Sequence, residues 1–158
     1  MKNVKRFAGA AGVLLIAGVV AMFSFSAAAS KPENLGAVDG KLAPCPGSPN
    51  CVSTQAADPK FRIEPIPFQG SGEAALTAIR SILEKMPRCR VITCGDGYLH
   101  AEFSSRLFGF VDDVEFLVDE ENRQLQFRSA SRVGYSDLGV NRRRMEQIRA
   151  EFSQRTAT

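Results

Sequence analysis

Hydrophobic positions recur with two different spacings along the chain, and the wider spacing predicts which segments are helices. Over residues 73–86 apolar side chains return every three or four positions, which is typical of an amphipathic helix that Ser71 or Gly72 would cap. A second pattern of this kind starts at about Asp137 or Asn141 and runs to residue 154. The apolar face of this closing helix contains Met145, Ile148 and Phe152.

In the remaining segments apolar and polar residues alternate, which predicts strands. Strands are expected over residues 61–68, 88–94, 98–104, 108–118 and 125–131. The first contains Pro65 and Pro67, which cannot donate backbone hydrogen bonds, so it is expected as an edge strand or an extended lead-in. Short turns between consecutive strands favour antiparallel pairing. The order β-α-β-β-β-β-α predicts a two-layer α+β fold, with an antiparallel sheet of four to five strands and two helices on one face.

The first 29 residues have the three parts of a secretory signal. A basic start is followed by an apolar run over residues 7–25, and small residues then offer an Ala-x-Ala cleavage site after Ala29. The alternative is an uncleaved membrane anchor, because a run of about 20 apolar residues can span a bilayer. Either way we expect export, to the periplasm or cell envelope or as an anchored protein facing outward. The remainder divides into an irregular segment (30–60) rich in Pro, Gly, Asn and Ser and a single α+β domain (61–155).

The net charge of +3 belongs to this N-terminal segment. Residues 1–29 hold three of the 20 basic residues and no acid, so the exported part has 17 basic and 17 acidic residues. Nucleic acid is therefore not an expected partner. Within the exported part the charges are segregated: residues 96–121 have eight acids and one Arg, and residues 123–155 have eight Arg and three acids. This predicts either an internal network of Arg–carboxylate pairs that ties the last helix to the sheet, or an anion pocket.

One carboxylate lies in the apolar phase of the strand predicted over residues 108–118. Asp112 shares its parity with core positions that include Phe108, Phe110 and Phe116, so it should have polar partners. Pairing Phe116 with either apolar residue of the next strand places Asp112 opposite Ser129 or Ser131. The same pairing places Arg128 opposite Asp113 or Glu115. We interpret Asp112 as a carboxylate that holds hydroxyls or backbone amides at the end of the sheet, with a solvent-lined site as the alternative.

The polar residues of this region define a candidate ligand site. Its members are Asp112, Ser129, Ser131, Arg132, Asn141 and Arg142. We favour a non-catalytic binding or structural protein of the envelope, in which this cluster stabilises the fold or holds a small anionic ligand or an envelope component. The alternative is an envelope hydrolase or transferase with Asp112 as base and Ser129 or Ser131 as nucleophile or substrate contact. No cofactor is expected, and a membrane contact is expected only through residues 7–25, if these are not cleaved.

Histidine and cysteine are too sparse to predict a metal site. The one histidine, His100, is expected on the surface beside a carboxylate. Cys45 and Cys51 lie six positions apart, which matches neither a redox nor a zinc spacing. In an oxidising compartment disulfides are the default. Cys89 and Cys94 lie too far apart along one predicted strand to pair with each other. This leaves a Cys45–Cys51 bridge with two thiols, or two bridges that tie the irregular segment to that strand.

Three blocks of sequence resemble a known family. They are Cys45–Ser53 (CPGSPNCVS), Ser105–Glu115 (SRLFGFVDDVE) and Arg128–Arg142 (RSASRVGYSDLGVNR). Their order and wording are similar to the family named domain of unknown function 1499, over about residues 41–152. The resemblance implies an exported or membrane-associated protein of bacterial or photosynthetic lineages, and it implies no reaction. It also favours the Cys45–Cys51 bridge, because Cys89 and Cys94 lie outside the pattern. The pattern positions are Ser48, Asn50, Asp112, Asp113, Arg128, Ser129, Ser131, Arg132, Asp137, Asn141 and Arg142.

Overall fold

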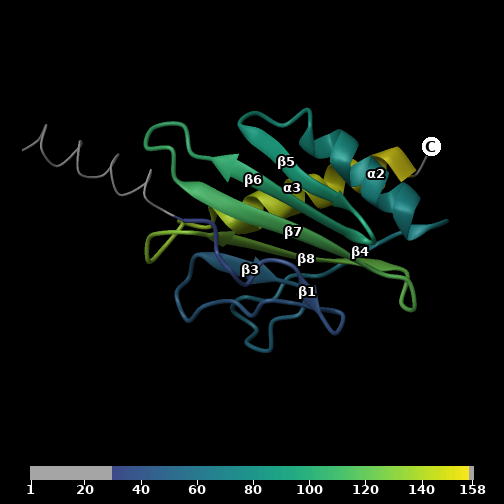
Figure 1. Cartoon of the computed structure of the whole chain (residues 1–158), viewed down its shortest axis with the longest axis horizontal. Coiled ribbons are helices and arrows are strands. Elements are labelled where there is room, and N and C mark those ends of the chain that lie inside the picture. Colours follow the sequence, from purple (N-terminus) through teal and green to yellow (C-terminus); the bar gives the residue numbers. More distant parts are fainter. Residues whose placement is uncertain (1–29, 157–158) are drawn as a thin grey trace, which may run out of the picture.

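A computed structural model describes residues 30–156 of the chain. Its centre is a six-stranded antiparallel sheet, with two helices on one face (Figure 1). The strand order is β3 (Cys51–Ser53), β8 (Gln124–Ser131), β7 (Val111–Asp119), β6 (Tyr98–Ser104) and β5 (Cys89–Gly95), and β4 (Ile66–Pro67) also pairs with β8. The helices are α2 (Gly72–Leu83) and α3 (Val140–Thr156). The two-layer α+β fold expected from the sequence is confirmed.

Helix α2 forms where the spacing of apolar residues predicts it. The backbone of Ser71 is extended, and its hydroxyl accepts a hydrogen bond from the backbone N–H of Ala74, which caps α2. Residues at three- and four-residue spacing on α2 are buried against the sheet. On α3 the expected apolar face is confirmed, because Met145, Ile148 and Phe152 are all buried. Both helices therefore bury one stripe against the same sheet face.

The register of the two central strands follows one of the two pairings allowed by the alternation. Phe116 lies opposite Phe127, and their ring centroids are 6.0 Å apart. This register places Asp112 opposite Ser131 and Arg128 opposite Glu115. Since the side-chain period of a strand is two, β7 presents Asp112 to the helix side and Asp113 to the other side. Two consecutive carboxylates are thus sent to opposite faces of the sheet.

The strand predicted over residues 108–118 is too long at its start. Strand β7 begins at Val111, and residues 105–110 form a loop that closes on itself. The Ser105 hydroxyl accepts from the backbone N–H of Phe110, and Gly109 has a φ of 65°, in the left-handed region that ends extended backbone. The rings of Phe108 and Phe110 pack on each other, 5.7 Å apart, and are only half-buried. Their place in the core was therefore predicted wrongly.

The segment predicted to be irregular over residues 30–60 contains three short strands. A hairpin joins β1 (Ala37–Val38) to β2 (Lys41–Leu42), and its turn residues Asp39 and Gly40 both have positive φ. Strand β3 pairs with Arg128–Ala130 of β8 and adds an edge to the main sheet. All three residues of β3 are buried, so the strand shows no alternation. Two- and three-residue strands carry too little period to be found from the sequence.

Among residues 30–156, no helix is both long enough and apolar enough to cross a membrane. The signal or anchor predicted over residues 1–29 lies outside the described residues.

Candidate functional site

The start of α3 is built around the buried side-chain amide of Asn141. The carboxylate of Asp137 accepts from the backbone N–H groups of Gly139 and Asn141, at 2.9 and 2.7 Å, and so caps the helix. The capped helix points the Asn141 amide at β8, where its Oδ1 accepts from the Ser129 hydroxyl at 2.5 Å. Its Nδ2 donates to the Ser131 hydroxyl at 3.1 Å. Ser129 and Asn141 are both fully buried, so this junction is closed to solvent.

Among residues 30–156, Asp112 pairs with an arginine of α3 and not with a hydroxyl or a backbone amide. The Arg144 guanidinium donates to Asp112 Oδ2 at 2.6 Å and to Asn141 Oδ1 at 2.7 Å. It also lies over the ring of Phe103, 4.4 Å from the centroid. The expected partners of Asp112 were therefore wrong, although the expectation that it has a partner is confirmed. Its side chain is 13% exposed, and the ion pair ties α3 to β7.

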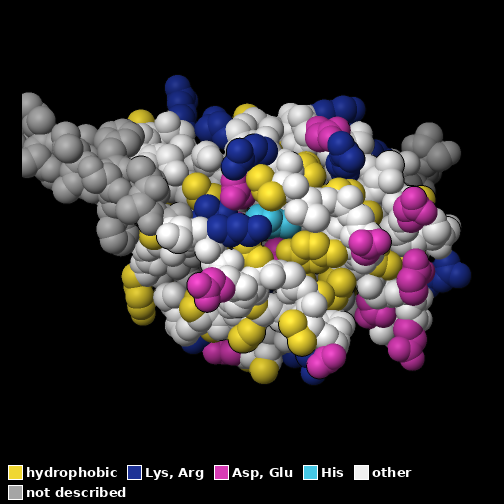
Figure 2. All heavy atoms as spheres, viewed as in Figure 1, with side chains coloured by type: hydrophobic (Ala, Val, Ile, Leu, Met, Phe, Trp, Pro, Cys, Tyr) yellow, Lys and Arg dark blue, Asp and Glu magenta, His cyan; other side chains and the backbone are white. Residues whose placement is uncertain are grey.

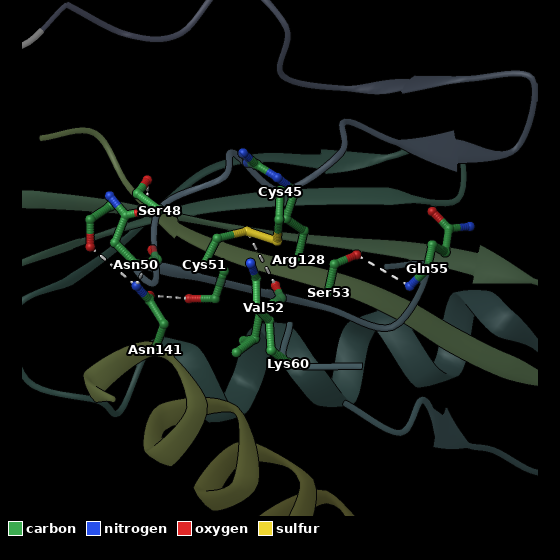
Figure 3. The surroundings of a disulfide bond; sticks show 12 residues. Cys45, Ser48, Asn50, Cys51, Val52, Ser53, Gln55, Lys60, Arg128 and Asn141 are labelled. Carbon is green, nitrogen blue, oxygen red and sulfur yellow. Dashed lines mark hydrogen bonds between the residues drawn. A yellow bond between two sulfur atoms is a disulfide. The ribbon is translucent and has the colours of Figure 1, made fainter. Parts of the chain in front are cut away.

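The disulfide loop closes the other side of the same junction. Cys45 and Cys51 are bonded, while Cys89 and Cys94 are free thiols, which confirms the pairing that the family resemblance favours. Within the loop Asn50 is buried, and its backbone carbonyl accepts from Asn141 Nδ2 at 3.0 Å (Figure 3). Its side-chain Nδ2 donates to the carbonyl of Gly134 at 2.7 Å. The disulfide loop is thus hydrogen-bonded to the segment that connects β8 to α3.

A second polar cluster lies on the opposite face of the sheet, away from the helices. Arg132 donates to both carboxylate oxygens of Asp113 at 2.8 Å and to Glu102 at 2.5 Å. Nε2 of His100 donates to Asp113 Oδ1, also at 2.8 Å. His100 is 2% exposed, so its expected place on the surface is wrong, although it does lie beside a carboxylate. Arg132 is therefore separated by the sheet from the other members of the predicted site.

A buried glutamate beside this cluster joins the N-terminal segment to the sheet. Glu115 is fully buried, and it accepts from the Tyr98 hydroxyl at 2.8 Å, the backbone N–H of Gly36 at 2.8 Å and Arg128 Nη1 at 3.2 Å. Burial and the Glu115 carboxylate raise the pKa of Tyr98 far above its usual value, so the hydroxyl remains a donor. The bond from Gly36 shows that the segment before β1 covers this face of the sheet. That cover explains how a face rich in charge is also buried.

The carboxylates of the second cluster are held in their charged form. Burial alone would raise the pKa of Asp113, but the hydrogen bonds from Arg132 and His100 outweigh it and lower that pKa. Burial likewise opposes ionisation of Glu102, and the bonds from Arg90 and Arg132 lower its pKa. His100, Glu102 and Asp113 each place one possible metal-ligand atom within 4.8 Å of the others. However, Arg132 already supplies a cation to both carboxylates, so the group forms an ion network and not an open metal site.

One known family matches most of the described residues. The model of the family described as "Protein of unknown function (DUF1499)" matches residues 41–152. The chain belongs to this family. None of the curated proteins matches the chain. The matched range begins in β2 and ends in α3, so it includes both polar clusters and the disulfide loop of the DUF1499 domain.

The residues predicted for the site are thus divided between three places in the DUF1499 domain. Asp112, Ser129, Ser131 and Asn141 meet at the start of α3, and Arg132 lies on the other face. The guanidinium of Arg142 donates to the backbone carbonyls of Lys60 and Arg62, both at 3.0 Å. Sequence reasoning missed Arg144, whose neighbours Arg142 and Arg143 look the same in the sequence. It also missed Glu102 as a partner of Arg132, because no spacing links the two.

Acidification should weaken the DUF1499 domain through the second cluster. Because the pKa values of Asp113 and Glu102 are lowered in the folded state, their contribution is complete above their unfolded values of about 4 and is lost as the pH falls below that. We expect Glu102→Gln to cost about 1–3 kcal/mol at pH 7, since it removes charge-assisted hydrogen bonds, and much less near pH 3. Urea unfolding at both pH values measures this.

The control for this measurement is Glu64→Gln, which removes an exposed carboxylate. It should leave the free energy of unfolding within about 0.5 kcal/mol of the parent at either pH. A cost of Glu102→Gln that is the same at pH 7 and pH 3 would show that ionisation of Glu102 contributes nothing to the fold.

Proposed function

We propose that this protein is an exported, non-catalytic domain of the cell envelope, in which the predicted ligand cluster stabilises the fold. The observation that supports this most is the mutual pairing of its groups. Asp112 is bound by Arg144, the hydroxyl of Ser129 by Asn141, and the guanidinium of Arg132 by two carboxylates. Groups that are hydrogen-bonded to one another in this way have few donors or acceptors left to bind a ligand.

The geometry also argues against the alternative proposal that the protein is a hydrolase or transferase. Ser129 is fully buried and its hydroxyl is already engaged, so it is not placed to attack a substrate. Ser131 and Asp112 do line a cavity of about 290 Å³ at the start of α3. The residues described as lining this cavity include no histidine, and Asp112 Oδ2 is bound by Arg144. The second carboxylate of this lining, Asp137, accepts from two backbone N–H groups at the start of α3. A nucleophile at Ser131 would therefore have no unengaged base, which favours the non-catalytic proposal.

Thermal unfolding with added anions tests the role of the cluster. Inorganic phosphate, citrate and glucuronate represent three anion chemistries that bidentate guanidinium groups recognise. We expect no rise in melting temperature that depends on Arg132 or Arg142, because both guanidinium groups are occupied within the chain. A rise of several degrees with one of these anions, abolished by Arg142→Gln and retained in Arg155→Gln at the far end of α3, would identify a ligand site there and contradict the proposal.

Export is tested separately, on protein isolated from cells that express the full chain. If residues 1–29 act as a secretory signal, N-terminal sequencing should find Ser30 as the first residue, and mass spectrometry should find Cys45 and Cys51 joined. Retention of Met1 in the membrane fraction with the domain facing outward would instead support the anchored form of the proposal. Uncleaved protein in the cytosol with reduced cysteines would contradict export.

A further inference from the structure

One end of the domain exposes most of its large apolar side chains. Six large hydrophobic residues are exposed among those described. Four of them lie at one end of the sheet, in the β6–β7 loop (residues 105–110), in the β8–α3 loop (residues 132–139) or at the first residue of α3. These four, here called the apolar rim, are Leu107 (71% exposed), Tyr135 (77%), Leu138 (83%) and Val140 (40%). Residues of both loops line the cavity of about 290 Å³, so the two loops lie side by side. A group of exposed apolar side chains in one place is typical of an interaction surface.

A cavity rich in arginine adjoins the apolar rim. It has a volume of about 590 Å³, and its lining includes Arg88, Arg106, Arg143 and Arg144, with Asp112 as the one acid. It shares Ser105, Asp112 and Val140 with the first cavity, so the two are neighbours. Here it is called the arginine pocket.

The positive charge of the arginine pocket is not neutralised within the described chain. Asp112 and Arg144 pair with each other. Arg88 and Arg143 donate only to backbone carbonyls, those of Ser104 and Leu138, which carry no net charge. Arg106 is exposed and has no hydrogen bond or ion pair to a described residue. Three guanidinium groups therefore line one cavity without a carboxylate partner. These are not the arginines of the ligand site predicted from the sequence, Arg132 and Arg142.

We propose that this end of the domain binds the surface of an anionic phospholipid membrane. The headgroup phosphate lies in the arginine pocket, because guanidinium groups bind phosphate oxygens in a bidentate manner. The apolar rim enters the boundary between headgroups and acyl chains, where leucine side chains leave water and a tyrosine keeps its hydroxyl in the interface. This deepens the function proposed above by naming a partner, and it depends on that function for the location of the domain beside a membrane.

The place where the described chain begins also supports an orientation in which the apolar rim faces the membrane. The first described segment of the chain, drawn in purple, starts at the end of the sheet where β6 and β8 end and α3 begins, which is the end with the apolar rim (Figure 1). In the sequence, the apolar run over residues 7–25 comes shortly before it. If that run is retained as an anchor, it enters the bilayer next to this surface. A single weak anchor is strengthened by a second contact with the same membrane.

The charge distribution also orients the domain. Asp and Glu side chains gather at the right-hand end of the molecule in Figure 2, opposite the end at which β6 and β8 finish in Figure 1. That end contains Asp96 in the turn before β6, Asp119 as the last residue of β7, and Glu120 and Glu121 in the turn that follows. An anionic membrane surface repels this acidic end and attracts the arginine pocket. Electrostatic forces would therefore turn the end with the arginine pocket toward the membrane.

The absence of tryptophan from the sequence allows a direct test. In the full chain, Leu138→Trp introduces one fluorophore in the apolar rim, and Val38→Trp introduces one at a site of similar exposure (75%) on the β1–β2 hairpin. Each variant is mixed with vesicles of phosphatidylcholine alone or with phosphatidylglycerol, with brominated acyl chains as quenchers. We expect a blue shift and quenching at position 138 on the anionic vesicles, and neither at position 38.

Two further variants test the role of the arginines. Arg106→Gln combined with Arg143→Gln, in the Leu138→Trp background, should weaken binding to anionic vesicles by on the order of tenfold, because each basic side chain near the surface contributes separately. Arg123→Gln combined with Arg155→Gln removes two arginines elsewhere and is the matched control, expected to bind as the parent does.

Three results would overturn the proposal. The first is equal quenching at positions 38 and 138, which would mean that the domain has no preferred face. The second is equal binding to neutral and anionic vesicles. The third is protection against thermal unfolding by inorganic phosphate that the arginine variants remove, with no response to vesicles, which would assign the pocket to a soluble phosphate. None of these results affects the closed cluster around Asn141, so failure here is distinct from failure of the proposed function.

Discussion

The buried amide of Asn141 is the interaction on which the arrangement of the domain depends. It joins three segments that are distant in the sequence: the start of α3, the strand β8 through Ser129 and Ser131, and the disulfide loop through the carbonyl of Asn50. A buried amide left without partners would be costly. Since all of these bonds form in one placement of α3 on the sheet, the amide specifies that placement. The arginine pocket and the apolar rim, which lie around the start of α3, depend on it in turn.

The sheet separates the charges of the chain into two independent networks. On the helix side Arg144 binds Asp112, and on the other side Arg132 binds Asp113, the next residue of the same strand. Buried pairs of this kind contribute little net stability compared with apolar packing, but breaking one leaves an unpaired buried charge. The acids and arginines that are segregated along the sequence thus pair with each other mainly inside the fold. What remains is a surplus of guanidinium groups at one end, which is the chemistry that the proposed membrane contact uses.

The parts of this structure that follow a regular period could be predicted from the sequence. The face of α3 with Met145 and Ile148, and the parity that turns Asp112 toward the helices, follow from repeats of 3.6 and 2 residues. The burial of His100 could not be predicted, because it depends on the segment around Gly36 covering the second face of the sheet. The choice of Arg144 as the partner of Asp112 depends on where α3 lies, and the strand β3 is too short to show a period. Local pattern therefore predicts elements and faces, and the pairing of charges across the sheet needs the tertiary structure.

The central claim is that the cluster around Asn141 exists to stabilise the fold, and the free energy of unfolding of Asn141→Ala tests it most directly. This variant removes the acceptor of the buried Ser129 hydroxyl and one of the two donors to the Asn50 carbonyl, which keeps only its bond from the backbone N–H of Ser131. We predict a loss of at least about 2 kcal/mol, against about 0.5 kcal/mol or less for Asn122→Ala in an exposed turn. Residues kept for binding or catalysis are often suboptimal for stability. An Asn141→Ala variant as stable as the parent, or more stable, would contradict the account.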